Sequence, residues 1–282
     1  MGAVAPLVAA RRPLGRKPRP LNGNPTGLSE PPFIHLANVR KVYQTRGEEF
    51  LAVSDVTMDV GVGELLSLVG PSGCGKTTIL KILAGLHGHD GGTVRIGTPK
   101  HSFDPSRDVG MVFQQSVLLK WRRILENVLL PAEILGLPVR ESRERARDLL
   151  HMVGLDGFED KYPYELSGGM QQRASIARSL IHDPKLILMD EPFGALDALT
   201  REKMNLELLR IWEESKKTIV FVTHSIQEAV FLGSRSAVLT AGPARMAEVF
   251  KIDLAYPRTL AMKSSKKFGE YTSRIYNHLG MK

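Results

Sequence analysis

Hydrophobic residues fall into two alternating patterns from residue 33 onward. Short, nearly continuous apolar runs predict buried strands, most clearly ELLSLVG, KLILMD (185–190) and TIVFVTH (218–224). FIHLANVRKVY, LAVSDVTMDV, 92–97 and 109–113 are further strand candidates. Apolar residues at i, i+3 and i+4 predict helices near 123–136, 140–153, 168–182, 199–216, 225–233 and 266–279. Strands that alternate with helices predict an α/β fold whose sheet is covered on both faces.

The same patterns divide the chain into three parts. Residues 1–32 hold seven prolines and few large apolar side chains, so they cannot offset the entropy of ordering and are predicted to be disordered. Residues 33–255 form the predicted α/β domain, in which the helices from about 115 to 180 indicate a helical subdomain. Residues 256–282 are predicted to be a basic tail that is partly helical.

The net charge of +8 resides in the two ends of the chain. Residues 1–32 hold five Lys or Arg against Glu30, residues 251–282 hold seven against Asp253 and Glu270, and the middle therefore carries −1. A nucleic-acid-binding domain is expected to carry positive charge on its folded surface, so we predict no nucleic-acid partner. The ends are either solvated or in contact with anionic lipid. No apolar run approaches the roughly 18–20 residues that span a bilayer.

The segment GPSGCGKTT matches the phosphate-loop pattern G-x-x-x-x-G-K-[ST] between a predicted strand and a predicted helix. Its glycines let backbone N–H groups turn toward phosphate oxygens, and the helix directs its positive end at the anion. The predicted nucleotide-binding residues are Gly70, Pro71, Ser72, Gly73, Cys74, Gly75, Lys76, Thr77 and Thr78. Lys76 is expected to reach the β- and γ-phosphates, and the Thr77 hydroxyl to bind Mg²⁺.

Asp190 ends the predicted strand KLILMD, where a buried carboxylate is costly without a cation. Mg²⁺ held by Asp190 and Thr77 would supply that cation. The sequence therefore predicts that this site binds a nucleoside triphosphate and Mg²⁺ as cofactors.

Five other polar residues leave alternatives open when they are considered alone. Ser167 and Asp197 are suitable N-caps for the helices that follow them. His224 ends a strand, where a histidine is often a hydrogen-bonded core residue. Gln114 and its neighbour Gln115 are equal candidates by composition, and Tyr43 suits either a core or a surface position.

The segment LSGGMQQR (166–173), placed between the phosphate loop and LILMDEP, resembles the signature of ABC-type ATPases. The resemblance covers roughly residues 33–255. It implies a P-loop NTPase core with a mainly parallel sheet, an N-terminal antiparallel β region and a helical subdomain. It also implies that two copies enclose two ATP molecules, each bound by one phosphate loop and the facing signature.

The resemblance implies catalytic roles for three residues. Glu191 would polarise the attacking water, and His224 would contact the γ-phosphate and hold the water and the base in place. The pattern of apolar residues followed by FQ selects Gln114, which would meet Mg²⁺ or the water and begin the link to the helical subdomain.

The same resemblance implies binding roles for five more residues. Ser167, Gly168 and Gly169 would direct free N–H groups at the γ-phosphate bound by the opposite subunit. Asp197 would lie in a loop that crosses the dimer interface. Tyr43 would stack on adenine, with modest selectivity for the base because stacking needs only a flat face.

The stretch FQQSVLLKWRRILENVLLP (113–131) resembles the importer branch that serves nitrate, sulfonates, taurine and similar compounds. In that branch Lys120 is usually a proline, and the stretch docks the membrane partner. The implied partners are transmembrane permease subunits and, indirectly, a periplasmic or extracellular binding protein. The implied location is the cytoplasmic face of the cell membrane.

Two alternatives remain for the function. A soluble ABC ATPase acting on nucleic acid or ribosomes usually carries two cassettes or a long coiled coil, whereas this chain has one cassette and no heptad run. A non-hydrolysing module is disfavoured by the presence of Glu191 and His224.

Cys74, the single cysteine, has two interpretations. The helix N-terminus and Lys76 both lower the pKa of a nearby thiol, which predicts a reactive cysteine that MgATP shields. Alternatively, Cys74 fills a buried position that requires a small side chain.

Overall fold

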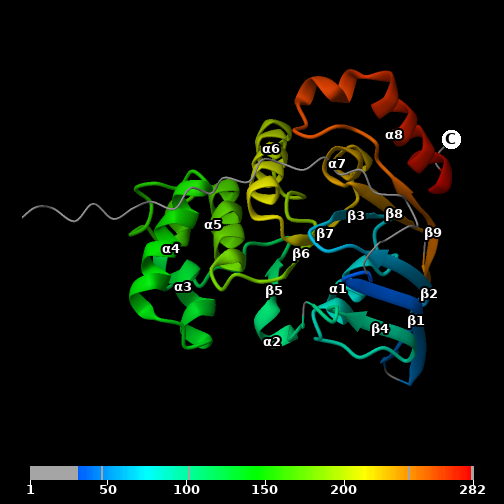
Figure 1. Cartoon of the computed structure of the whole chain (residues 1–282), viewed down its shortest axis with the longest axis horizontal. Coiled ribbons are helices and arrows are strands. Elements are labelled where there is room, and N and C mark those ends of the chain that lie inside the picture. The colour runs from blue at the N-terminus through cyan, green and yellow to red at the C-terminus, as the bar shows by residue number, and fades with distance from the viewer. Residues whose placement is uncertain (1–30, 46, 101, 241, 281–282) are drawn as a thin grey trace, which may run out of the picture.

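A single mixed sheet organises the molecule, as seen in a computed structural model that describes residues 31–45, 47–100, 102–240 and 242–280. Within these residues the nine strands lie in the order β4-β1-β2-β9-β8-β3-β7-β6-β5 (Figure 1). The strands are β1 (Ile34–Thr45), β2 (Glu48–Val60), β3 (Leu65–Val69), β4 (Gly91–Ile96), β5 (Val109–Val112), β6 (Leu186–Asp190), β7 (Thr218–Thr223), β8 (Arg235–Leu239) and β9 (Ala244–Lys251).

The sheet has a parallel part and an antiparallel part. Strands β8, β3, β7, β6 and β5 are parallel, and every residue of β3 and β7 is buried because both faces of this part are covered. Strand β1 pairs antiparallel with β2 and β4. Strand β9 joins the two parts, parallel to β2 and antiparallel to β8. The carboxyl ends of β3, β5, β6 and β7 therefore meet at one edge.

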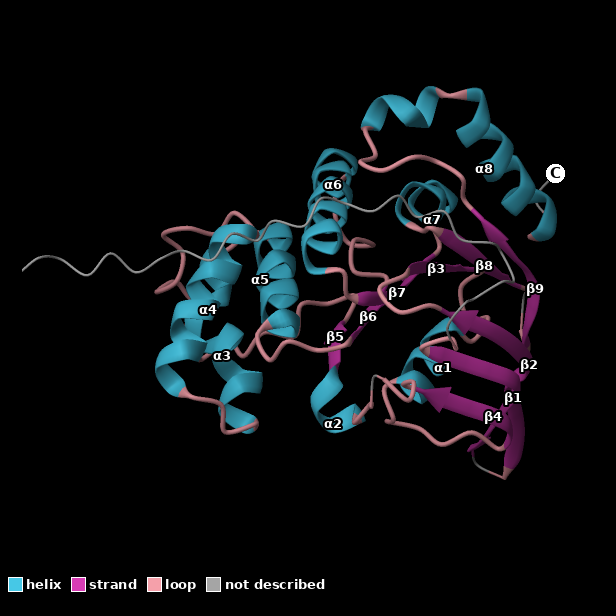
Figure 2. Cartoon of the chain, in the orientation of Figure 1, coloured by secondary structure: helices cyan, strands magenta, loops and turns pink. Residues whose placement is uncertain are grey.

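Helices cover the two faces of the sheet (Figure 2). Leu66 and Leu68 of β3 pack in one apolar cluster with Ile79 of α1. Leu65 and Val69 point to the opposite face, because side chains alternate along a strand, and pack with α6, α7 and α8. The helices are α1 (Lys76–Leu83), α2 (Pro105–Asp108), α3 (Ile124–Ile134), α4 (Val139–Met152), α5 (Gly168–Leu180), α6 (Ala198–Ser215), α7 (Ile226–Leu232) and α8 (Lys266–His278).

Three helices form a separate group beyond β5. Figure 1 shows α3, α4 and α5 together at one end of the molecule, away from β1, β2 and β4. Val128, Leu150 and Ile176, one from each helix, are fully buried in their shared core. None of the described helices is both long and apolar enough to cross a bilayer.

Several elements go beyond the predicted set. The apolar patterns did not indicate α2, β8 or β9, and short 3₁₀ turns occur at Pro163–Glu165 and Leu260–Ser264. A helix does occupy the predicted stretch near 266–279, where α8 is anchored by the buried Phe268 and Ile275. The extension predicted to be disordered, residues 1–32, lies outside the described residues except for its last two positions.

Candidate active site

The phosphate-loop segment connects β3 to α1 through backbone conformations that favour glycine. Gly73 and Gly75 have φ values of +74° and +106°. A Cβ on Gly75 would lie 2.8 Å from the carbonyl oxygen of Ala52 and 2.9 Å from Cβ of Ala244. Any side chain at Gly75 would therefore be strained and would displace the loop from β2 and β9.

Lys76 is the first residue of α1, and its side chain folds back onto this loop. Its side chain is 4% exposed, and its Nζ donates to the carbonyl oxygens of Gly70 and Pro71, each 2.9 Å away. The same Nζ lies 3.6 Å from Oε1 of Glu191. The Lys76 ammonium group is thus held against the loop and close to the carboxylate of Glu191, which follows β6.

Asp190 and Thr77, the two expected Mg²⁺ ligands, lie side by side in the structure. The Thr77 hydroxyl donates to Oδ1 of Asp190 at 3.2 Å. Burial raises the pKa of Asp190, and the adjacent Glu191 charge adds to this rise, whereas the bond from Thr77 and the charge of Lys76 oppose it. A cation near Asp190 would relieve the burial cost of its charged form.

The arrangement of these two residues suits Mg²⁺. Two oxygen ligands at about 2.1 Å and at right angles in an octahedron are roughly 3 Å apart, close to the observed Thr77–Asp190 separation. In the described part of the chain, no cluster of three or more His, Cys, Asp or Glu side chains could hold a metal ion. Mg²⁺ is typically held by one or two protein groups plus phosphates and water, so the two residues fit this ion.

Glu191 has an unusual backbone conformation. Its φ is +47°, which is uncommon for a residue with a side chain, while its N–H donates to the carbonyl oxygen of Val222 at 3.0 Å. Such strained conformations concentrate at functional sites. The turn directs the carboxylate between two basic groups, Lys76 and His224.

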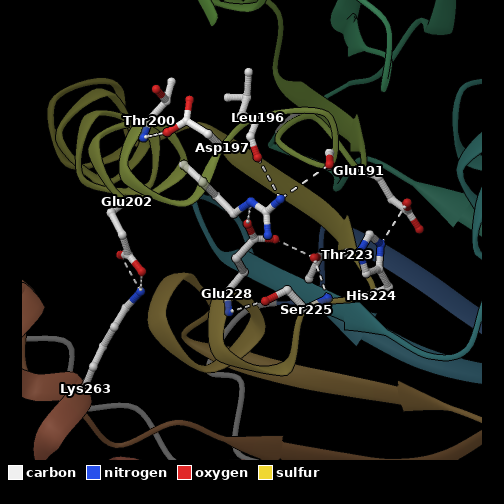
Figure 3. A network of polar contacts seen from close by, with 12 residues as sticks. Glu191, Leu196, Asp197, Thr200, Glu202, Thr223, His224, Ser225, Glu228 and Lys263 are labelled. Carbon is white, nitrogen blue, oxygen red and sulfur yellow. Dashed lines mark hydrogen bonds and ion pairs between the residues drawn. The ribbon is translucent and has the colours of Figure 1, made fainter.

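His224 contacts Glu191 directly. Its Nδ1 lies 3.0 Å from Oε2 of Glu191 (Figure 3). In the tautomer that carries its proton on Nδ1, His224 donates to Glu191 and Nε2 is left for another partner. The His224 side chain is 49% exposed, so His224 is not the hydrogen-bonded core histidine that its position at a strand end also allowed.

Gln114 lies close to His224 and Gly194. A Cβ built on Gly194 would be 3.4 Å from Nε2 of Gln114 and 3.8 Å from Cε1 of His224, which places both side chains around Gly194. The preceding residue is fixed by α5, because Nε2 of Gln172 donates to the carbonyl oxygen of Phe113 at 3.0 Å.

Sequence reasoning missed the α5 residues that hold the chain on both sides of Gln114. Arg178 donates to the carbonyl oxygens of Ser116 and Val117, each at 2.8 Å. Gln172 is 3% exposed and lies one helical turn before the buried Ile176. A polar residue at a buried position of an amphipathic helix is the signal that could have indicated this contact.

The structure does not bring the signature residues to the phosphate loop. Ser167 caps α5 by accepting from N–H of Met170 at 3.3 Å, and Gly168 has open space where a Cβ would lie. Among the described residues, no hydrogen bond or ion pair joins Ser167, Gly168 or Gly169 to residues 70–78. A Cβ on Gly169 would instead lie 3.0 Å from Cγ2 of Thr200 at the start of α6.

Asp197 caps α6. Its Oδ1 accepts from N–H of Thr200 at 3.0 Å, and this bond is the largest of the interactions that lower the pKa of Asp197. The capping interpretation is therefore present in the structure. A role across a dimer interface stays a prediction, and the two roles are compatible because Asp197 is exposed.

Tyr43 is half-buried on β1, at some distance in sequence from the loop. Its ring contacts His87 edge-to-face, with 5.7 Å between ring centroids, and Nζ of Lys41 lies 5.6 Å from the Tyr43 centroid. Sequence reasoning did not consider His87, which follows α1 and is 44 residues from Tyr43. Adenine stacking on Tyr43 stays a prediction.

The prediction of a lowered thiol pKa at Cys74 is wrong. Cys74 is 1% exposed, and its burial raises the thiol pKa more than Lys76 and the backbone N–H groups lower it. The alternative interpretation, a small side chain in a buried position, describes Cys74 better.

Comparison with known proteins agrees with this arrangement. Residues 53–194 match the ABC transporter family. An uncharacterized ABC transporter ATP-binding protein from Methanocaldococcus jannaschii is 48% identical over 87% of this chain and 91% of its own length. A taurine import ATP-binding protein from Roseobacter denitrificans is 43% identical (82% and 87%), and an aliphatic sulfonates import ATP-binding protein from Bacillus cereus is 38% identical (86% and 94%).

A solved structure supports the same assignment. A dimeric ATP-binding cassette in a post-hydrolysis state, bound to ADP and Pi, is 35% identical and has a TM-score of 0.68 over 79% of this chain and all of its own. The fold is therefore that of a P-loop ABC ATPase, as predicted. The chain belongs to the ATP-binding subunits of the ABC transporter family, and it is an ATPase.

Proposed function

We propose that this chain drives an ABC importer, in which two copies hydrolyse ATP and move two separate permease subunits that admit a small anionic solute. The observation that carries the hydrolytic part is the convergence of Lys76, Glu191 and His224 at the carboxyl edge of the sheet. The chemistry of such a site is largely positioning and charge neutralisation, as in other phosphoryl transfers.

Glu191 is the proposed base. Its carboxylate is held by His224 on one side and lies near Lys76 on the other, so its oxygens are oriented before a water molecule is bound. Glu191 accepts a hydrogen bond from the attacking water and takes up its proton. Nε2 of His224, which Glu191 leaves free, faces the γ-phosphate.

Lys76 and the backbone N–H groups of the loop bind the phosphates. The Lys76 ammonium exchanges its two carbonyl partners for phosphate oxygens, and the α1 N-terminus adds its dipole. Thr77, Asp190 and Gln114 would hold Mg²⁺, which neutralises charge on the β- and γ-phosphate oxygens when it is bound.

A second copy completes each site in this proposal. Among the residues that the structure describes, no hydrogen bond or ion pair joins Ser167, Gly168 or Gly169 to the phosphate loop, and the N-terminus of α5 offers N–H groups and a positive dipole end. The dimeric form of the related cassette supports this arrangement.

An exposed apolar surface next to α3 is the proposed docking site for a permease. We call it the Trp121 surface, and it consists of Val117, Trp121 and Ile134, which are 57%, 74% and 74% exposed. The ion pair between Arg122 and Glu133, at 2.6 Å, keeps the Trp121 segment beside the end of α3. Apolar anchors beside charged residues are typical of protein interfaces.

The expected cargo is taurine, an alkanesulfonate or nitrate. The names of two relatives, import proteins for taurine and for aliphatic sulfonates, support the first two. The chain itself is expected to lie at the cytoplasmic face of the membrane and to respond to a cargo-loaded binding protein through the permease.

Trp121→Ala tests whether the Trp121 surface couples cargo transport to ATP hydrolysis. In vesicles that contain the permease and the binding protein, cargo should stimulate ATP hydrolysis by the wild type and much less by the variant, because the anchor is lost. Basal hydrolysis by the isolated subunit should be unchanged. Tyr276→Ala, which removes another exposed aromatic on α8, is the matched control and should couple normally.

Two outcomes would contradict the proposal. Equal stimulation of the wild type and Trp121→Ala would remove the coupling role of the Trp121 surface. No stimulation of the wild type by a binding protein loaded with any of the three anions would reject the cargo class.

A further inference from the structure

A buried carboxylate behind His224 has no place in the mechanism described so far. Glu228 of α7 is 6% exposed, and the guanidinium of Arg201, on α6, lies beside it. Figure 3 shows the contacts that surround Glu228, which join two segments that flank the catalytic residues. A buried carboxylate is costly unless it is paired, so its presence calls for an explanation.

Arg201 holds the first of these segments. Its NH2 group donates to the carbonyl oxygen of Leu196 at 2.9 Å and to that of Gly194 at 3.4 Å. Both carbonyls belong to the loop that runs from Glu191 to Asp197. The position of the guanidinium and the path of this loop are therefore set together.

Glu228 holds the second segment, the turn that carries His224. The Thr223 hydroxyl donates to Oε2 of Glu228 at 2.5 Å and accepts from N–H of Ser225 at 2.9 Å. The Ser225 hydroxyl in turn accepts from N–H of Glu228 at 3.3 Å. The residues on both sides of His224 are thus attached to Glu228.

The link between Arg201 and Glu228 is incomplete in this structure. Nε of Arg201 lies 3.7 Å from Oε1 of Glu228, which is beyond a hydrogen bond, and neither buried atom has another hydrogen-bond partner. A shift of roughly 0.7 Å would form the bond. Burial raises the pKa of Glu228, and the charge of Arg201 opposes that rise, so a closer approach would favour the charged carboxylate.

We propose that Arg201 and Glu228 are a positioning pair that ties the Asp197 loop to the His224 turn. A movement of the loop at the dimer interface closes or opens the Arg201–Glu228 contact, and Glu228 passes the movement through Thr223 to His224. Since His224 contacts Glu191, the pair sets the geometry of the base without touching the nucleotide. The inference rests on the proposed roles of Glu191 and His224.

Glu228→Gln tests the pair. The substitution keeps the size of the side chain but removes its charge, which weakens its contact with Arg201. Because His224 and Glu191 would then be misplaced, kcat for ATP hydrolysis should fall about 10- to 100-fold. KM for ATP should stay within about twofold, because the phosphate loop is not touched.

Glu64→Gln is the matched control. Glu64 forms a bidentate pair with Arg235 at 2.6 and 2.8 Å and is also largely buried, but it precedes β3 at the opposite edge of the sheet. This variant should lose stability and keep kcat. If Glu228→Gln fails to fold, Thr223→Val removes the same link at the His224 turn and should lower kcat in the same way.

A double-mutant cycle with Arg201→Gln distinguishes positioning from general stability. The two kcat losses should be strongly non-additive if the residues act as one unit. A kcat for Glu228→Gln or Thr223→Val no lower than that of Glu64→Gln, or fully additive losses, would overturn the inference. Normal turnover by Glu191→Gln would instead reject the proposed base, whatever the pair does.

Discussion

The carboxyl edge of the sheet and the N-terminus of α5 differ in how far their functional groups are arranged. At the edge, Glu191 contacts both Lys76 and His224, and Thr77 contacts Asp190. At α5, the Ser167 hydroxyl accepts a hydrogen bond from its own helix, and Gly168 faces open space. The first region holds an oriented set of groups within one chain, whereas the second offers N–H donors for which the described residues of the same chain provide no hydrogen-bond partner.

This difference has a physical consequence. Oriented groups can bind phosphate and activate water at little further cost, but the charge that develops on the γ-phosphate still needs donors on its outer side. The proposed second copy would supply them from α5. The predictions below alter one region at a time, beginning with the largest expected effect.

Replacing Glu191 by Gln should stop hydrolysis without stopping binding. Loss of a general base typically lowers the rate about 10²–10⁴-fold, while Lys76 and the phosphate loop stay intact. The ATP that is bound but not hydrolysed should hold two copies together, which size-exclusion chromatography with MgATP would detect. A variant with near-normal turnover would assign the base elsewhere.

Replacing Gly168 by Asp should impair hydrolysis by acting on the facing copy. Nothing lies within 4 Å of a Cβ there, and an acidic residue suits the first turn of a helix, so the single chain should fold normally. The added charge would repel the γ-phosphate and lower the rate by roughly 100-fold, similar to loss of an oxyanion donor.

A matched control exists on α8. Gly269 also lies near a helix N-terminus with open space around its Cβ position, and Gly269→Asp should hydrolyse ATP like the wild type. ATP binding by monomeric Gly168→Asp should also be normal. If Gly168→Asp matches the Gly269→Asp rate, α5 does not face the phosphate.

Labelling of Cys74 should show the smallest effect. Because burial raises the thiol pKa, less thiolate is present at a given pH than on an unperturbed thiol, and the side chain is shielded as well. Maleimide should react more slowly with the native chain than with the chain in denaturant. The native rate should rise as the pH increases toward the raised pKa. If maleimide labelled the native chain faster than the denatured chain at neutral pH, the interpretation of Cys74 as a reactive thiol with a lowered pKa would be correct after all.

The sequence predicted β3, β5, β6 and β7 of the parallel part but not β8, and it predicted best the strands that are strongly apolar. β3, β6 and β7 are short runs that are buried on both faces, so their composition alone distinguishes them. Strand β9 was missed because only two of its eight residues are buried and its sequence includes the charged residues Arg245, Glu248 and Lys251. A strand at the junction of two sheet parts, such as β9, need not have the continuous apolar run of a core strand.

The candidate site was predictable where a motif carries the chemistry, and less so where packing decides. The expectations for the phosphate loop and Asp190 follow from local patterns, whereas the role expected of Glu191 came from the resemblance to ABC-type ATPases. The Cys74 pKa was misjudged because the sequence shows the nearby Lys76 and helix start but not the burial that outweighs them. Arg201 and Glu228 were missed because they are 27 residues apart and look like ordinary charged positions on two helices.

The position of Gly75 has a consequence for how the fold opens. Strand β2 pairs with β9 through Val53–Ala244 and Asp55–Arg245, against five residue pairs between β3 and β7. This short ladder is a weak seam, where local unfolding is expected to begin. Gly75 packs against Ala52 and Ala244, one on each side of the seam. A phosphate bound by the loop would therefore also hold the two parts of the sheet together, so that nucleotide binding would raise the cooperativity of unfolding.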